Sequence, residues 1–399
     1  MRKNRSRKSV CLISGGIHAR NMRLQPWRYL GEVATELRRQ GHEVTVITEG
    51  VETAVSAPHL YRISSISNRL WQENRQLLQT IAKIQPDIIL WHIGLTSFLH
   101  QRFDPGLDVP VVGVFTSPIY ETSDLTRISV QRMVAGRQIS SIHTIGALLP
   151  NRLLRQMASR SKHLQQLVVQ TETTGHQLQQ SHLSRLPISV IPPGVDTVWE
   201  NGRFTPTNQL RKELGYDKTD VVVLYFGSPA PLRGLHTLIE AVRMVETAVP
   251  TIKLLILSRR RADELLEEDA ELRQLLANPA MQARSQIISG YLEPENLVKH
   301  ISVADIVALP FELVPSDAPL SLLEAKALGK PVVTTQVACL PELVADGLHY
   351  LAQPADAVSL AHALMQAAFD LPSNKQIILP SIRRWQQVGE EWSRLIQAM

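Results

Sequence analysis

The chain has 399 residues, enough for two or three domains that each bury a core. Its hydrophobic content of 44% and charged content of 20% are ordinary for a globular protein. No apolar run reaches the roughly 18 residues that a membrane span needs, and the first one is too short for a signal peptide. Cys11 and Cys339 lack zinc-type spacing, which excludes a cysteine-rich zinc site or disulfide framework and favours a reducing compartment, with the cytoplasm as the expected location.

The net charge of +5 is concentrated in one region of the chain. Eight basic residues lie between Arg127 and Arg185, against the single acid Glu172. This bias fits either a solvated helical face or attraction to an anionic membrane surface, and the segment 148–167 has the apolar spacing of an interfacial or an ordinary surface helix. Aromatic residues do not alternate with the arginines, so no nucleic-acid partner is expected.

In chain order, the first half reads as alternating strands and helices. A strand over 9–14 leads into the glycine pair Gly15 and Gly16, a helix over 25–41 and a second strand over 42–50. Further strands are predicted at 87–94, 110–117, 166–173 and 188–194, with the basic helical segment between the middle two. A strand, helix and strand in succession demand a parallel sheet with right-handed crossovers. Residues 1–190 are therefore predicted to form a doubly wound α/β domain.

Residues 191–215 are rich in Pro, Gly and turn formers at their start and are predicted to link two domains. The pattern then restarts, with strands at 221–228, 252–260, 285–292, 305–311 and 331–335 and helices between them and after them. Residues 216–375 therefore form a second doubly wound domain. The last helix, over 376–399, carries Trp385 and Trp392 and is expected to cross back to the first domain. Ligands of such sheets bind at the carboxyl ends of the strands, which predicts a cleft between the domains.

The stretch PSDAPLSLLEAKALGKPVVTT, residues 315–335, places two acids near the start of an apolar helix. With a helix beginning near Ala318, Asp317 serves as its N-cap and shares a face with Glu324. A cap explains Asp317, but a carboxylate inside the apolar helix needs another partner. A ribose diol fits Glu324, because an ionised carboxylate accepts two hydroxyl donors, and the helix N-terminus beside it favours phosphate.

Two further features belong to the predicted cleft. Arg233 follows the first strand of the second domain, where a guanidinium can clamp a diphosphate; the alternative is a surface arginine in a turn. Gly15 and Gly16, on the opposite wall, allow backbone amides to approach a phosphate or sugar. The third glycine of the dinucleotide fingerprint is absent, so a nicotinamide enzyme is disfavoured.

These residues resemble the retaining GT-B glycosyltransferases of family 4 over nearly the whole chain. The resembling segments are RQGHEVTVIT, VIPPGVDTVWENGRFTP, YFGSPAPLRGLHTLIEA and LPSDAPLSLLEAKALGKPVVTT, the last matching a helix with a Glu-x7-Glu motif. The resemblance implies two Rossmann-like domains facing across a cleft. It also implies that Glu324 binds the donor ribose, Arg233 holds the diphosphate, and Gly15 and Gly16 approach the donor phosphate and sugar. His92 lies at a strand end where the family often has a histidine near the reacting sugar.

Two positions depart from the family pattern. The first Glu of the motif falls at Ser316, with Asp317 beside it as a stand-in, and the arginine of the diphosphate turn falls at Ser228. We therefore expect His92, Arg233 and Asp317 in catalysis, and Gly15, Gly16, Arg233, Ser316 and Glu324 in donor binding.

The implied reaction is sugar transfer from a nucleotide-diphospho-sugar, UDP or GDP, to an acceptor hydroxyl on a glycan, lipid or small molecule. It retains the anomeric configuration and uses no metal or other cofactor. The two departures leave open a non-catalytic nucleotide-sugar-binding subunit or sensor. A GT-B epimerase is less favoured, because it would need extra carboxylates on the first domain.

Overall fold

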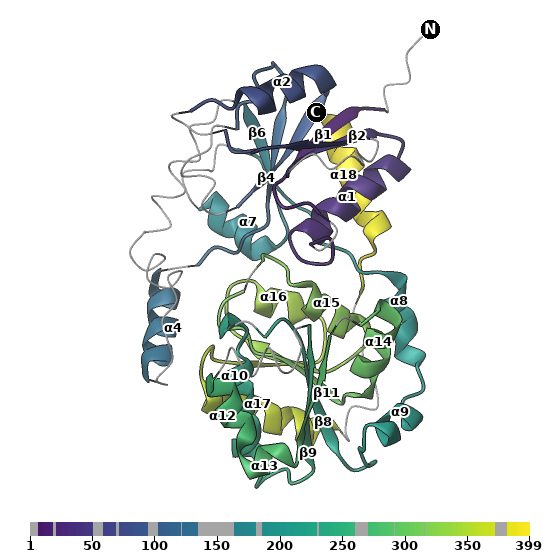
Figure 1. Ribbon diagram of the computed structural model, residues 1–399. Helices are drawn as coiled ribbons and strands as arrows, with labels where there is room; N and C mark the ends of the chain where they lie inside the picture. The colour runs from purple at the N-terminus through teal and green to yellow at the C-terminus, as the bar shows by residue number, and fades with distance from the viewer. Residues whose placement is uncertain are drawn as a thin grey trace.

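The structure is a computed structural model in which two α/β units are stacked one above the other (Figure 1). It describes residues 7–18, 21–50, 59–68, 72–94, 103–120, 122–134, 163–180, 186–229, 231–259, 270–290, 292–314, 316–371 and 381–399. Most of the basic segment, including 148–162, lies outside the described residues.

The upper unit contains a seven-stranded sheet in the order β3-β2-β1-β4-β5-β6-β7, and every adjacent pair is parallel. Its strands are β1 (Ser9–Ile13), β2 (Glu43–Glu49), β3 (Leu60–Ile63), β4 (Ile88–Ile93), β5 (Val111–Phe115), β6 (Leu164–Val169) and β7 (Ile188–Val190). Its helices include α1 (Trp27–Arg39), α2 (Arg75–Ile84) and α7 (Glu172–Gln179). The sequence prediction omitted β3, whose residues are mostly half-buried and give no clear alternation.

The lower unit contains a six-stranded parallel sheet in the order β10-β9-β8-β11-β12-β13. Its strands are β8 (Val221–Gly227), β9 (Ile252–Ser258), β10 (Ser285–Ser289), β11 (Ile306–Leu309), β12 (Val332–Thr335) and β13 (His349–Ala352). The helices packed with it include α10 (Leu235–Val245), α12 (Ala270–Ala277), α13 (Pro279–Gln282), α14 (Pro294–Val303), α15 (Leu320–Ala327), α16 (Leu340–Val344) and α17 (Ala357–Asp370). The short strand β13 was missing from the sequence prediction.

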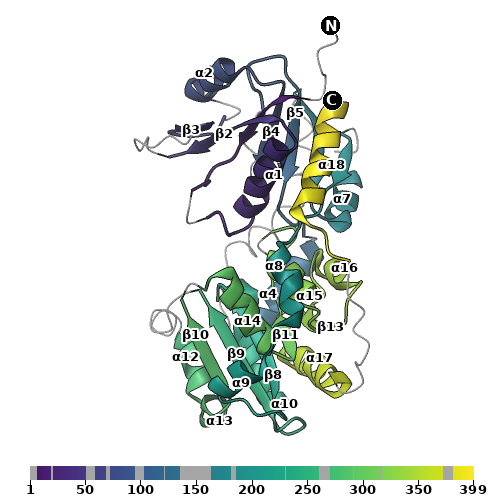
Figure 2. The ribbon, with the colours of Figure 1, turned by 90° about the vertical axis from the view of Figure 1, so that its right-hand side faces the viewer.

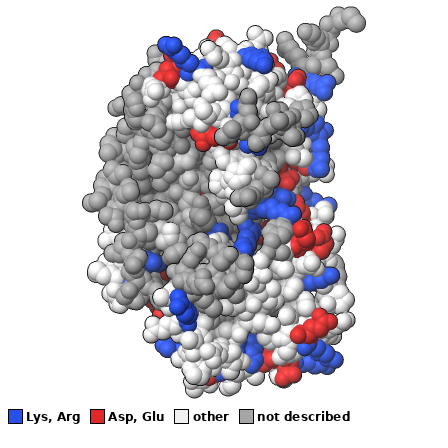
Figure 3. Space-filling view, in the orientation of Figure 1, with Lys and Arg blue, Asp and Glu red and all other residues white. Residues whose placement is uncertain are grey.

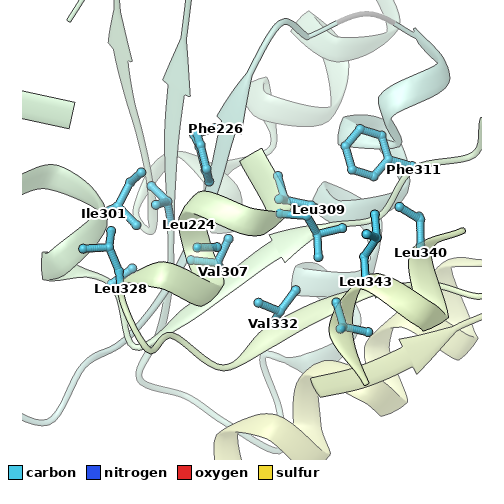
Figure 4. Close-up of a cluster of buried hydrophobic side chains, with 14 of the residues drawn as sticks. Leu224, Phe226, Ile301, Val307, Leu309, Phe311, Leu328, Val332, Leu340 and Leu343 are labelled. Carbon is cyan, nitrogen blue, oxygen red and sulfur yellow. The ribbon is translucent and has the colours of Figure 1, made fainter. Parts of the chain in front are cut away.

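Each sheet has a hydrophobic core on both faces, because successive strand residues point to opposite sides. In β8, Leu224 and Phe226 enter one core, while Val223 and Tyr225 enter the other. Figure 4 shows Leu224 and Phe226 pointing into the first of these cores, toward side chains of α14, β11, β12 and α16. Two doubly wound domains, the fold expected from the sequence, are confirmed.

The connection between the units contains α8 (Thr197–Asn201), the 3₁₀ turn η1 (Gly202–Phe204) and α9 (Asn208–Glu213). The last helix, α18 (Trp385–Ala398), lies along α1 in the upper unit (Figure 2). The indole N–H of Trp392 donates to the hydroxyl of Tyr29 at 3.0 Å, and both side chains are buried. The C-terminal segment therefore joins the first domain's core rather than the second's.

One segment of the first half packs with the second unit. The helix α4 (Thr122–Val134) lies beside the lower unit in Figure 1. Leu125 and Ile128 belong to the core of the lower unit, and the buried guanidinium of Arg132 forms an ion pair with the buried carboxylate of Glu312. The helix α4 thus falls within residues 1–190, which the sequence assigns to the first domain, but its apolar face and Arg132 find their partners in the second unit.

Candidate functional site

A pocket lies where the second sheet meets the connection between the units. It encloses about 880 Å³, its open mouth included. The carboxyl ends of β8 and β9, the residues after β10, helices α14 and α15, and the connection form its walls. Its lining residues are Arg23, Arg28, Gly194, Val195, Asp196, Trp199, Phe226, Gly227, Leu257, Ser258, Arg259, Gly290, Leu292, Pro294, Leu297, Leu320, Glu324 and Trp385. This is the edge of a parallel sheet at which ligands bind.

Glu324 lines this pocket from α15. Burial raises the pKa of its carboxyl to about 7, and the nearby Arg259 opposes that shift. Within the described part of the chain, no hydrogen bond or ion pair reaches its side-chain oxygens. A half-buried carboxylate without a protein partner can accept hydrogen bonds from a ligand's hydroxyl groups.

Arg233 ends the 3₁₀ turn η2 (Pro231–Arg233) and lies just behind the pocket wall. Its guanidinium carbon is 5.5 Å from the centre of the Phe311 ring, and burial lowers its pKa. A Cβ on Gly227, a lining residue, would lie 2.8 Å from its Nη1, so the guanidinium packs directly against that glycine. Arg233 thus contacts the same wall as Glu324 without lining the pocket itself.

The turn that carries Arg233 depends on the next residue. Gly234 has φ of +73°, and a Cβ there would stand 1.9 Å from the carbonyl oxygen of Pro310. Only glycine satisfies both requirements. The backbone after β8 can therefore pass close to the end of β11, which fixes where Arg233 starts.

Asp317 does not cap its own helix, contrary to the sequence prediction. The helix α15 begins at Leu320, its N-cap is Pro319, and no side chain caps it. The carboxylate instead accepts hydrogen bonds from the upper unit: the backbone N–H of Gln170 (2.9 Å) and the hydroxyls of Thr171 (2.8 Å) and Thr174 (2.5 Å).

These three donors surround the N-terminus of α7, and Asp317 is 0% exposed. Burial raises its pKa to about 6, although the three hydrogen bonds act in the opposite direction. The expected catalytic carboxylate is therefore placed as a tie between the two units, with its oxygens already occupied by protein donors.

Ser316 and His92 lie near this tie. The hydroxyl of Ser316 is buried and has no hydrogen-bond partner among the described residues. The two ring nitrogens of His92 contact the hydroxyls of Ser14 (3.1 Å) and Thr116 (2.9 Å). Burial lowers the pKa of His92 to about 4, so the ring is neutral at pH 7. The backbone N–H of Asp317 donates to the carbonyl of Thr116 at 2.7 Å, so Thr116 links His92 to the contact between the two units.

Gly15 and Gly16 form the turn after β1 and do not line the pocket. The carbonyl of Gly15 accepts from the indole N–H of Trp27 at 2.7 Å and from the hydroxyl of Ser14 at 3.1 Å. Gly16 has φ of +75°, and a Cβ there would stand 2.6 Å from the same indole nitrogen. The structure therefore places Gly15, Gly16 and His92 on the side of the contact between the two units, while Glu324 belongs to the pocket.

Sequence reasoning missed several polar residues of the pocket. Arg28 of α1 donates to both carboxylate oxygens of Asp196, each at 2.9 Å, and also pairs with Glu32 at 2.9 Å. Arg259 follows β9, is exposed and lines the pocket. Arg28 and Asp196 could have been suspected only with the interdomain contact in hand, but Arg259 had a signal in its position after a predicted strand.

Basic side chains are visible at the waist of the molecule, between the two units, on the face shown in Figure 3. The pocket itself contributes Arg23, Arg28 and Arg259 to its lining. Two of the eight basic residues noted in the sequence are described, and both face acids: Arg127 pairs with Asp124 at 3.2 Å, and Arg132 is buried against Glu312.

Among the described residues, no cluster of three or more His, Cys, Asp or Glu side chains has the arrangement of a metal site. Within the same part of the chain, no helix combines the length and apolar character needed to span a bilayer. Cys11 and Cys339 are both buried as free thiols.

Comparison with known proteins gives two family matches, one for each unit. The model described as "Glycosyltransferase Family 4" matches residues 27–199, and "Glycosyl transferases group 1" matches residues 206–378. Together they cover most of both sheets and the pocket.

Individual curated relatives match about half of this chain. The D-inositol 3-phosphate glycosyltransferase of Segniliparus rotundus is 33% identical over 174 residues, which is 43% of this chain and 37% of that protein. The lipopolysaccharide 1,2-N-acetylglucosaminetransferase of Salmonella typhimurium is 27% identical over 192 residues, covering 47% of this chain and 49% of its own. The matched part thus spans about half or less of these relatives.

Solved structures match over nearly the full length. Sucrose-phosphate synthase from Thermosynechococcus elongatus aligns with a TM-score of 0.67 at 17% identity and covers 98% of both chains. HepE from Anabaena in complex with UDP aligns with a TM-score of 0.68 at 16% identity, covering 98% of this chain and 100% of that one. The two family matches, the two parallel sheets and this shared architecture show that the chain belongs to the GT-B glycosyltransferases.

Proposed function

We propose that the protein transfers a sugar from a nucleotide-diphospho-sugar, UDP- or GDP-linked, to an acceptor hydroxyl, with retention of the anomeric configuration. The observation that carries this proposal is the carboxylate of Glu324, which receives no hydrogen bond from the described residues and lines a pocket at the carboxyl edge of the second sheet. Its position suits a ribose diol, and the apolar side chains Leu257, Leu292 and Leu297 on the walls suit a nucleobase.

The chemistry proposed requires stabilisation of the negative charge that grows on the diphosphate as the sugar leaves. Arg233 beside Gly227 supplies positive charge at this wall, and the N-terminus of α15 adds the positive end of a helix dipole. We propose that these groups act without a metal ion. Backbone amides at the ends of the strands would complete the site.

Retention follows here from front-face attack, with a donor phosphate oxygen accepting the acceptor's proton. Asp317, a carboxylate at the contact between the two units, is fully buried and accepts three hydrogen bonds, which disfavours it as a nucleophile. His92 is neutral at pH 7 and contacts two hydroxyls, so its proposed role is to orient Ser14 and Thr116 at the strand ends.

The test is a thermal-shift screen of the full chain with UDP-, GDP- and ADP-sugars, followed by product analysis with the sugar that stabilises it most. Stabilisation by one sugar nucleotide and a product of retained configuration, formed in the presence of EDTA, are the expected results. Stabilisation by none of the three, or an inverted product, would contradict the proposal. Loss of turnover in EDTA would overturn its metal-independent part alone.

A non-catalytic nucleotide-sugar sensor of the same fold is a second candidate, favoured by Ser316 at the position of the first motif acid. Its hydroxyl is buried and carries no charge, so it cannot replace a carboxylate directly. If the protein is a sensor, it should bind the sugar nucleotide but neither transfer the sugar nor hydrolyse it slowly. Release of free nucleoside diphosphate above the background rate would exclude it.

We further propose a cytoplasmic location and an acceptor presented at an anionic membrane surface. Two of the matched relatives are named for D-inositol 3-phosphate and lipopolysaccharide. In this chain, α4 ends with exposed Val130, Met133 and Val134, and the basic segment follows. Flotation with vesicles containing anionic lipid should weaken as salt rises; equal flotation with neutral vesicles would remove the electrostatic part of the proposal.

A further inference from the structure

The arginines of the pocket differ in whether the protein already neutralises them. Arg28 is held by Asp196 and Glu32, and Arg23 pairs with Glu293 at 3.4 Å. Arg259 is exposed, and the described residues provide no hydrogen bond or ion pair to its guanidinium. An anionic ligand can therefore reach Arg259 without displacing a carboxylate.

The position of Arg259 follows from the register of the second sheet. Gly227 at the end of β8 pairs with Ser258 at the end of β9, and the backbone nitrogen of Arg259 lies 3.5 Å from the carbonyl oxygen of Gly227. The side chain of Arg259 thus begins at the strand edge where the pocket opens. Because Gly227 has no side chain, the guanidinium of Arg233 packs directly against its backbone, behind the pocket wall.

The charge of Arg259 acts on both Glu324 and Arg233, the two residues that the sequence predicts to bind the sugar donor. Its positive charge lowers the pKa of Glu324 on one side and the pKa of Arg233 on the other. Its guanidinium is therefore close enough to influence both. A nucleotide with its ribose on Glu324 would place the first phosphates in the same region.

Arg233 is less available to a ligand than the sequence suggested. It lies over the Phe311 ring, packs against Gly227 and is absent from the pocket lining. Because Arg259 is both exposed and in the lining, a diphosphate in the pocket can contact it directly.

We propose that Arg259, the residue after β9, is a second donor-phosphate contact, which binds the diphosphate beside the end of β8, the strand that precedes the turn of Arg233. This inference rests on the proposed function and names a binding residue for it. A guanidinium offers two parallel N–H groups to a phosphate, so Arg259 supplies positive charge beside the strand end at which Ser228 follows Gly227 in place of the family's arginine.

The experiment measures nucleotide binding by titration calorimetry with Arg259→Gln, Arg259→Lys and the matched control Arg243→Gln. Arg243 is an exposed arginine on α10 of the same domain, outside this pocket. The probes are the nucleoside, its monophosphate and its diphosphate, for whichever of UDP, GDP and ADP binds the wild-type chain most tightly.

Arg259→Gln should weaken diphosphate binding about tenfold or more and nucleoside binding less than about twofold. Arg259→Lys should restore part of the loss, and Arg243→Gln should bind like the wild type. An unchanged diphosphate affinity, or equal losses for nucleoside and diphosphate, would overturn the inference. Failure of the wild-type chain to bind any nucleotide would instead overturn the proposed function on which it rests.

Discussion

Asp317 and Glu324 stand seven residues apart, on either side of the start of α15, and burial raises the pKa of both, to about 6 and about 7. They differ in their partners. Asp317 accepts three hydrogen bonds from the upper unit, whereas no protein group within the described residues bonds to the Glu324 carboxylate. A raised pKa by itself therefore does not separate a structural acid from a ligand-binding one; the set of donors does.

The neighbouring acid Glu342 shows that the structural role is shared. Its carboxylate on α16 accepts from the backbone N–H groups of Glu172 and Thr173, both at 2.8 Å, and from the Thr173 hydroxyl at 2.7 Å. Together, Asp317 and Glu342 bind the N-terminal turn of α7, where unpaired N–H groups and the helix dipole favour negative charge. Two carboxylates of the second domain thus hold one helix of the first.

The largest expected effect comes from removing the structural acid. Asp317→Ala leaves three buried donors around α7 without their acceptor, which should lower the free energy of unfolding by about 2–3 kcal/mol. Calorimetric melting checks the loss, and hydrogen exchange should show reduced protection at the start of α7. The isosteric control Asp317→Asn should lose less, because its carbonyl oxygen still accepts. Unchanged melting with lost transfer activity would mean that Asp317 serves chemistry instead.

Glu324, the acid proposed to bind the ligand, should show the opposite pattern. Glu324→Gln removes a half-buried charge to which no group in the described part of the chain donates a hydrogen bond, so the melting temperature should stay the same or rise slightly. Nucleoside affinity should fall about tenfold, or about 1.4 kcal/mol. The reason is that the amide replaces one of the two oxygens that accept hydrogen bonds from the ribose hydroxyls with an NH₂ donor. Titration calorimetry with the nucleoside measures the loss. Intact nucleoside binding in this variant would remove the ribose role.

The pH dependence of nucleoside binding sharpens the same contrast. Ribose hydroxyls bind the ionised form of Glu324, so the bound state holds fewer protons than the free state. Affinity is therefore highest above its free pKa of about 7 and falls as the pH drops through that value. Between about pH 8 and about pH 6 the loss should approach about tenfold, as the ionised fraction falls. Calorimetry at both pH values should show a flat profile for Glu324→Gln; a slope that persists there points to another group.

The smallest expected effect comes from removing one donor of the tie. Thr174→Val deletes the 2.5 Å hydrogen bond to Asp317 and keeps the side-chain shape, so unfolding should become easier by about 1 kcal/mol. The matched Thr173→Val removes the half-buried contact to Glu342 and should cost less. Melting curves of both variants test the order. A larger loss in Thr173→Val would place the main tie at Glu342.

The sequence determined the local elements of this protein well. Alternating apolar strands and amphipathic helices predicted two doubly wound sheets, because period and burial are properties of nearby residues. The apolar helix with an internal acid also indicated a partner other than protein for Glu324, and the pocket lies there. The roles of all the proposed site residues, Glu324 included, stay predictions, since their placement alone does not test them.

Only the tertiary structure decided which domain each polar side chain serves. Asp317 bonds to residues about 145 positions earlier, and Arg132 is buried against Glu312, 180 positions away. Arg259 gains its significance from the register that brings the ends of β8 and β9 together with α15. Local pattern cannot encode these pairings, because the energy of a buried polar group depends on donors and acceptors that the chain delivers from distant positions.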